Sequence, residues 1–260
     1  MGFVRNALKL LLPPGVHRAL RRLLNLPVVR RIRYFGFAHY CPICRARVRS
    51  FLDFSVAYRH VVCPVCGLHP RHRLMWLYFT RKLQLFGPTP VKLLHIAPEK
   101  PFRDAFAKSP NIAYLSADLT MPRGPMVRMD LTKIPASNDV FDAIYCSHVL
   151  EHIREDRAAM RELLRVLRPR GWAILQVPID TNRDATLEDP AIQTPEDRGK
   201  HYWQFDHVRL YGNDYQARLE DVGFEVNVDW FVRTFTDADV RRLGLDRNEG
   251  IYFCTKAQRS

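Results

Sequence analysis

The sequence predicts an α/β protein with a parallel sheet covered by helices on both faces, preceded by a small cysteine-rich module. After Pro90, short apolar segments alternate with amphipathic helical segments, which is the pattern of a parallel sheet. Before Pro90, two Cys-x-x-Cys pairs stand in a segment too short to fold around a core of its own. Residues 87–90, Gly-Pro-Thr-Pro, break both patterns and indicate a boundary.

Charge divides the 260-residue chain near the same boundary. The net charge is +13, and residues 1–90 hold 16 of the 40 Lys and Arg residues but only one acid, Asp53. The rest of the chain is close to neutral. This distribution predicts attraction of the first part to a polyanion such as RNA, acidic lipid or an anionic glycan.

Residues 1–36 form a basic leader. Residues 16–26 mix apolar side chains with arginines and predict a short amphipathic helix, which would contact an acidic membrane or RNA. A solvated arm without a partner explains the same composition equally well. No apolar run reaches the roughly 18 residues of a membrane span, and no signal-peptide cleavage pattern is visible. We therefore expect a cytoplasmic location, with or without peripheral membrane contact.

Residues 37–70 predict a metal-binding module resembling a zinc ribbon. Cys41 and Cys44 form one pair, Cys63 and Cys66 form the other, and 18 residues separate the pairs. This spacing is typical of a four-thiolate zinc site, and a closed site of that kind is structural. Redox-active pairs are the alternative. Residues 71–90 are expected to form a connecting helix and a linker.

Residues 91–260 predict the sheet domain. A long polar insert, residues 180–212, follows the fifth strand, and segments of this kind often form substrate loops. We expect helices at 101–108, 157–167 and 215–222, and strands at 91–96, 112–117, 125–129, 140–146, 172–177, 224–230 and 251–255.

Acidic residues stand at the ends of two successive strands. Ligands of an open parallel sheet bind outside the carboxyl ends of the strands, near the switch in strand order. Asp118 ends the second strand and is suited to accept both ribose hydroxyls of a nucleoside cofactor. Asp130, after the third strand, is suited to an adenine amine. Caps of following helices are the alternative roles.

Several stretches resemble class I S-adenosylmethionine (SAM)-dependent methyltransferases of the broad type 11 kind. They are residues 114–118, 129–131, 141–153 and 165–175. The segments 93–99 and 204–211, with the upstream cysteine pairs, resemble a bacterial subgroup that carries an N-terminal zinc module. The resemblance implies a Rossmann-like seven-stranded sheet and SAM as cofactor. It implies cofactor contacts from His95, Ile96, Ala97, Glu99, Asp118, Leu119, Asp130, Leu131 and Ser147.

The turn after the first strand departs from the family pattern. His95 stands where an acid is common, and Ala97 and Glu99 stand where glycines are common. Either Glu99 itself bonds the cofactor, or the site is altered. A nicotinamide-dependent dehydrogenase would need a Gly-x-Gly-x-x-Gly motif here, and the sequence has none.

Methyl transfer mostly requires positioning of the nucleophile, with a base where that nucleophile carries a proton. His148, after the fourth strand, or His207, oriented by Asp206 in the insert, is the expected base, and Arg209 could hold an anionic acceptor. We expect transfer to an oxygen or nitrogen of a small molecule or glycan. The alternatives are an RNA methyltransferase that grips RNA through its basic zinc module, and a non-catalytic binding protein with this fold.

Overall fold

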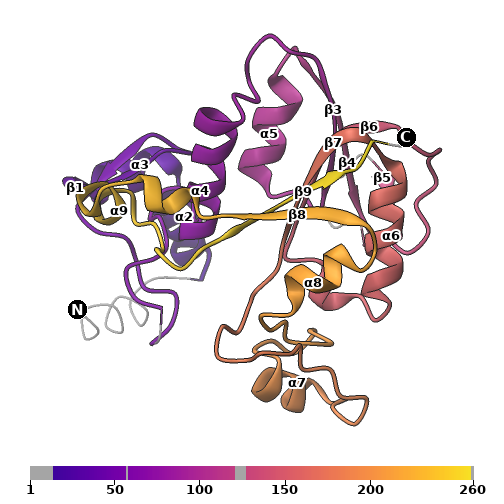
Figure 1. The fold of residues 1–260 in the computed structure, drawn as a ribbon. Helices are drawn as coiled ribbons and strands as arrows, with labels where there is room; N and C mark the ends of the chain where they lie inside the picture. The colour runs from indigo at the N-terminus through magenta and orange to yellow at the C-terminus, as the bar shows by residue number, and fades with distance from the viewer. Residues whose placement is uncertain (1–13, 57, 121–126, 259–260) are drawn as a thin grey trace. The chain divides into compact units, whose positions relative to one another are not determined.

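The computed structural model describes residues 14–56, 58–120 and 127–258. The chain folds into two compact units (Figure 1). The first, here the cysteine unit, comprises Met1–Lys82 and Val232–Glu249, and the second, the sheet unit, comprises Leu83–Phe231 and Gly250–Ser260. The expected continuous domain 91–260 differs from this division, because residues 232–249 leave the sheet unit and join the cysteine unit.

The cysteine unit is built around a short antiparallel ribbon. Strand β1 (Phe35–Cys41) pairs with β2 (Ala46–Val48); Cys41 ends β1, and Cys44 lies in the turn between the strands. The expected leader helix is present as α2 (Pro14–Leu24), and α3 (Pro27–Arg33) follows it. The expected connecting helix is present as α4 (Pro70–Leu77), which continues as a π-helical turn.

The C-terminal segment of the cysteine unit, Val232–Glu249, carries helix α9 (Asp237–Leu243). Arg73 of α4 holds this segment in place. The Arg73 side chain is fully buried, and its Nε and Nη2 donate to the carbonyls of Leu243 and Gly244 at 2.7 and 2.6 Å. Gly244 has φ +60, and a Cβ there would lie 2.4 Å from the Phe51 ring. A buried guanidinium that bonds several carbonyls explains why this distant segment belongs to the unit.

The sheet unit contains a seven-stranded sheet with the order β5-β4-β3-β6-β7-β9-β8 (Figure 1). All strands are parallel except β9, which runs antiparallel to both of its neighbours. The order reverses at β3, between β4 and β6, and such a switch is where ligands bind. The strands are β3 (Val91–Ile96), β4 (Ile112–Asp118), β5 (Val127–Arg128), β6 (Phe141–Ser147), β7 (Leu167–Gln176), β8 (Phe224–Asp229) and β9 (Ile251–Lys256).

Helices cover both faces of this sheet, as predicted. On one face, α5 (Lys100–Lys108) packs Phe102 and Phe106 against Tyr145 and His95. On the other face, α6 (Asp156–Val166) and α8 (Tyr215–Glu220) bury their apolar sides against alternate residues of the same strands. The mostly parallel Rossmann-like sheet is therefore confirmed.

Some elements differ from the expectations, and β7 begins at Leu167, five residues before the expected strand start. The expected third strand is reduced to Val127–Arg128, and residues 121–126 lie outside the described part of the chain. The insert contains a short helix that the sequence did not predict, α7 (Pro195–His201), capped by the Thr194 side chain. Among the described residues, no helix is both long and apolar enough to cross a membrane.

Candidate active site and metal centre

The turn after β3 has the geometry that a glycine would supply. Ala97 has φ +46, in the left-handed region, and its N–H donates to the Ala117 carbonyl at 2.8 Å. Alanine is the smallest residue with a Cβ, so it tolerates this conformation at a modest cost. Helix α5 then begins at Lys100, after Glu99 at its N-cap. The departure from glycine therefore leaves the tight turn intact.

His95 and Glu99, the other two unusual residues of this turn, contact each other. His95 Nε2 lies 3.0 Å from Glu99 Oε2, and His95 Nδ1 lies 3.0 Å from the Tyr114 hydroxyl. The His95 side chain has no exposed surface, whereas 20% of the Glu99 side chain is exposed. Both ring nitrogens of His95 are engaged inside the fold, so its predicted cofactor contact would come from the backbone and stays a prediction. Glu99 Oε1 accepts from the Tyr145 hydroxyl at 3.5 Å, so both of its oxygens bond within the protein.

Asp118 and Asp130 occupy equivalent positions at the ends of neighbouring strands. Asp118 Oδ1 accepts from the N–H and the hydroxyl of Thr120 at 2.8 and 2.9 Å. Asp130 Oδ1 accepts from the same two groups of Thr132 at 2.9 and 2.8 Å. These bonds lower the pKa of Asp130. Within the described residues, each turn engages only Oδ1, so Oδ2 remains for a ligand.

The remaining predicted cofactor contacts fall into two groups. Leu119, next to Asp118, is 56% exposed, which is unusual for a leucine at the edge of a core. Ile96, Leu131 and Ser147 are buried. The left-handed turn, two carboxylates and an exposed apolar side chain therefore fit an adenosyl cofactor.

His148 follows β6, beside the switch in strand order. Its backbone has φ +56, and its N–H donates to the Gln176 carbonyl of β7 at 2.8 Å. Its Nδ1 lies 3.3 Å from Oε1 of Glu151, and a quarter of the side chain is exposed. The structure thus places this predicted base at the open edge of the sheet, next to a carboxylate.

The insert, residues 180–212, packs against the loop after β6, and His207 lies at this contact. The N–H of Val208 donates to the Glu151 carbonyl at 2.9 Å, and His207 Nδ1 lies 2.8 Å from the Tyr202 carbonyl. Burial lowers the pKa of His207. The prediction that Asp206 orients His207 is wrong. The Asp206 carboxylate faces a different histidine: its Oδ2 lies 3.5 Å from Nδ1 of His152.

Glu151 is the site residue that sequence reasoning missed. Its side chain is fully buried, and with His152 and His207 it forms a cluster whose ligand atoms lie within 4.8 Å of one another. The signal was present in the stretch His148–His152, where an acid stands between two histidines. Nothing in the sequence showed that His207 would join them.

Arg209 bonds extensively within the protein. It is 3% exposed, and its guanidinium donates to the carbonyls of Leu150, Ile153 and Arg154 and to Glu188. All three nitrogens fasten the insert to the loop after β6, and the role of Arg209 toward an anionic acceptor stays a prediction.

In the cysteine unit, the four predicted metal ligands converge. The Sγ atoms of Cys41 and Cys66 lie 3.7 Å apart, as do those of Cys44 and Cys63, and all four lie within 4.8 Å of one another. A tetrahedron of thiolates bound at about 2.3 Å has edges of about 3.8 Å. A disulfide would bring two sulfurs to about 2.05 Å. The cluster therefore has the geometry of a four-coordinate metal site.

Comparison with known proteins shows what part of the sheet unit is similar to. Residues 103–175 match a family model described as a methyltransferase domain. A demethylmenaquinone methyltransferase of Mycolicibacterium paratuberculosis is 45% identical over 53 residues, which is 20% of this chain and 23% of that protein. The chain thus matches about a quarter of the length of this curated relative.

Solved structures resemble the chain at lower identity. An S-adenosylmethionine-dependent methyltransferase from Mesorhizobium loti is 18% identical with a TM-score of 0.46, covering 70% of this chain and all of that chain. A SAM-dependent methyltransferase from Archaeoglobus fulgidus is 13% identical with a TM-score of 0.45, covering 70% and 93%. The strand order of the sheet and the match of residues 103–175 agree that the sheet unit is similar to a methyltransferase domain.

Proposed function

We propose that this protein transfers a methyl group from SAM to an oxygen or nitrogen nucleophile of a small molecule or glycan. The single observation that carries the proposal is the pairing of two equivalent carboxylates, Asp118 and Asp130, at the ends of the strands beside the switch point. SAM, when bound, supplies a methyl group that is already activated on a sulfonium.

Each residue at this edge of the sheet would contact a different part of the cofactor. Asp118 Oδ2 would accept hydrogen bonds from the ribose hydroxyls, and Asp130 would accept one from the adenine amine. Leu119 would cover the base with its exposed side chain. Ala97 keeps the turn tight enough for its backbone to approach the cofactor.

His148 is the residue that we assign as base. It is partly exposed at the end of β6, and the Glu151 carboxylate 3.3 Å away would stabilise the positive charge that the ring gains with a proton. His207, the other candidate, is only 6% exposed and is held by the Tyr202 carbonyl, which suits a positioning role better.

We further propose that the cysteine cluster holds a structural zinc ion. Four thiolates with tetrahedral spacing leave no open coordination position, so the ion would stabilise the cysteine unit and take no part in the transfer.

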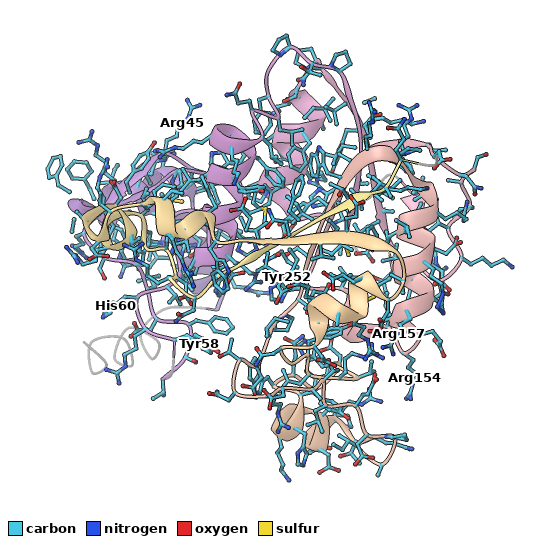
Figure 2. The ribbon with its side chains drawn as sticks, in the orientation of Figure 1. Arg45, Tyr58, His60, Arg154, Arg157 and Tyr252 are labelled. Atoms are coloured by element: carbon cyan, nitrogen blue, oxygen red, sulfur yellow. The ribbon has the colours of Figure 1, made fainter. Side chains whose placement is uncertain are left out.

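A second candidate, an RNA methyltransferase, is favoured by one observation on the cysteine unit. Phe35 and Phe37 are 55% and 73% exposed, their rings are 5.1 Å apart, and Arg47 lies over the Phe37 ring. Figure 2 shows Arg45, Tyr58 and His60 projecting from the same unit. Exposed aromatics among cations are the usual means of stacking single-stranded bases.

Labelled SAM distinguishes these candidates. The full chain would be incubated with methyl-labelled SAM and separate glycan, lipid, metabolite and RNA fractions, and the labelled fraction would be identified. We expect label in a glycan or small-molecule fraction, lost in Asp118→Ala. The matched control is Asp246→Ala, which removes an acid from a similar turn in the cysteine unit. Label in RNA, with binding that weakens steeply with salt, would select the second candidate.

A further inference from the structure

A buried carboxylate in the sheet unit accepts no hydrogen bond from the described residues, and its one charge partner there is a partly exposed histidine, His148. Glu151 lies in the short turn Leu150–His152 after β6, and its side chain has no exposed surface. Neither of its oxygens accepts a hydrogen bond from any described residue, and His148 Nδ1 approaches Oε1 to 3.3 Å without forming one. Buried carboxylates are normally paired or bound to a metal, so the surroundings of Glu151 indicate a missing positive charge.

Two imidazoles near this carboxylate are oriented as metal ligands usually are. His207 Nδ1 lies 2.8 Å from the Tyr202 carbonyl, and His152 Nδ1 lies 3.3 Å from the Asp206 carbonyl. A ring that donates its Nδ1–H to a carbonyl keeps a lone pair on Nε2. This arrangement of an outer acceptor behind each histidine is the common second layer of a metal site.

The three side chains converge. One ligand atom from each of Glu151, His152 and His207 lies within 4.8 Å of the others, and the two rings stand nearly perpendicular with centroids 4.7 Å apart. Ligand atoms bound at about 2.1 Å from one ion are separated by about 3.0–4.2 Å, so small rotamer shifts close the site. Two imidazoles and one carboxylate leave coordination positions open, unlike the four thiolates of the cysteine unit.

We propose that Glu151, His152 and His207 bind a divalent first-row metal cation, and that its open positions receive a hydroxyl oxygen of the methyl acceptor. The cation site itself stands on the geometry above, whereas its use rests on the proposed methyl transfer. The cluster shares its loop with His148, at the carboxyl end of β6. A cation at this place would hold an acceptor hydroxyl and lower its pKa, which selects an oxygen nucleophile over a nitrogen one.

Manganese is a suitable probe because it favours nitrogen and oxygen donors over thiolates. The zinc-loaded full chain would be titrated with Mn²⁺, and free Mn²⁺ would be measured by electron paramagnetic resonance. We expect one Mn²⁺ per chain, with affinity at least about tenfold lower in Glu151→Gln and in His207→Ala. His201→Ala, which removes an exposed histidine of the same insert, should bind like the wild type.

Thermal unfolding of each variant shows whether it is folded. Should Glu151→Gln fail to fold, Asp206→Asn provides the second test, because Asp206 is half-exposed and lies behind His152. Several-fold weaker Mn²⁺ binding in that variant would support the site. Absence of Mn²⁺ binding by the folded wild type, or equal binding by Glu151→Gln, would overturn it. Asp118→Ala should keep Mn²⁺ binding while losing SAM. A wild-type chain that binds Mn²⁺ but no SAM would sink the methyl transfer and leave the cation site standing.

Discussion

Nε2 of His95 lies 3.0 Å from Oε2 of Glu99, so the two residues that depart most from the usual family pattern are partners of each other. The histidine replaces a common acid at the end of the first strand, and the glutamate replaces a common glycine of the turn. The Glu99 carboxylate, four residues along the chain, lies beside the end of this strand. Each unusual residue satisfies the other, which explains how the turn keeps its shape.

Glu99→Ala should therefore destabilise the sheet unit. It leaves a buried imidazole nitrogen without its acceptor, and the expected loss is about 1–3 kcal/mol of unfolding free energy. Glu99→Gln keeps an acceptor oxygen and should lose less. Urea unfolding of both variants checks this, and equal stability of Glu99→Ala and the wild type would show that the contact contributes nothing.

The backbone of Ala97 provides a second prediction. Its φ of +46 is strained for any residue with a Cβ, most of all for a β-branched one. We expect Ala97→Gly to be at least as stable as the wild type and Ala97→Val to lose about 1–2 kcal/mol or more. Melting temperatures measure both, and a clear loss of stability in Ala97→Gly would contradict the assigned strain.

The alternation of strands and helices was predictable because each strand buries a short apolar run and each helix one apolar face. Asp118 and Asp130 were predictable because strand ends in a parallel sheet share one edge. The link from Arg73 to Gly244 was not, because it joins positions 171 residues apart and neither residue has a distinctive neighbour pattern. The same holds for His207, which reaches Glu151 only through the path of the insert.

Acid stability should depend on Asp156. Burial opposes its ionisation, but hydrogen bonds from Arg218 at 2.8 and 3.0 Å and the charge of Arg209 outweigh burial and lower its pKa. A carboxyl whose pKa is lowered by folding stabilises the fold above its unfolded pKa of about 3.9, and this contribution is lost as the pH falls through the folded value. Unfolding free energy should therefore fall as the pH is lowered below about 4.

Asp156→Asn tests that assignment. The variant should be less stable at neutral pH, and its unfolding free energy should fall less steeply as the pH is lowered. Part of the pH dependence should remain, because the pKa of Glu188 is also lowered by folding. Asp221→Asn, which changes an exposed acid that faces Arg157 at 3.6 Å, serves as the control (Figure 2 labels Arg157). Parallel pH profiles for Asp156→Asn and the wild type would exclude Asp156 as the source.

The cysteine cluster predicts a metal that resists mild chelation. After brief treatment with EDTA, the full chain should retain one zinc ion per chain, because a closed four-thiolate site exchanges through local unfolding. Cys63→Ser should lose that ion and lower the melting temperature. Cys254→Ser changes a buried cysteine of the sheet unit and should retain the zinc. Unchanged metal content in Cys63→Ser would refute the site.

Calorimetric titration of the folded, zinc-loaded chain with SAM tests the central claim most directly. The account predicts one SAM per chain, with binding at least about tenfold weaker in Asp118→Ala because ribose hydroxyls lose a charged acceptor. Asp246→Ala should bind like the wild type. No detectable binding to the wild type, or equal affinity in Asp118→Ala, would contradict the assignment of the sheet edge as a cofactor site.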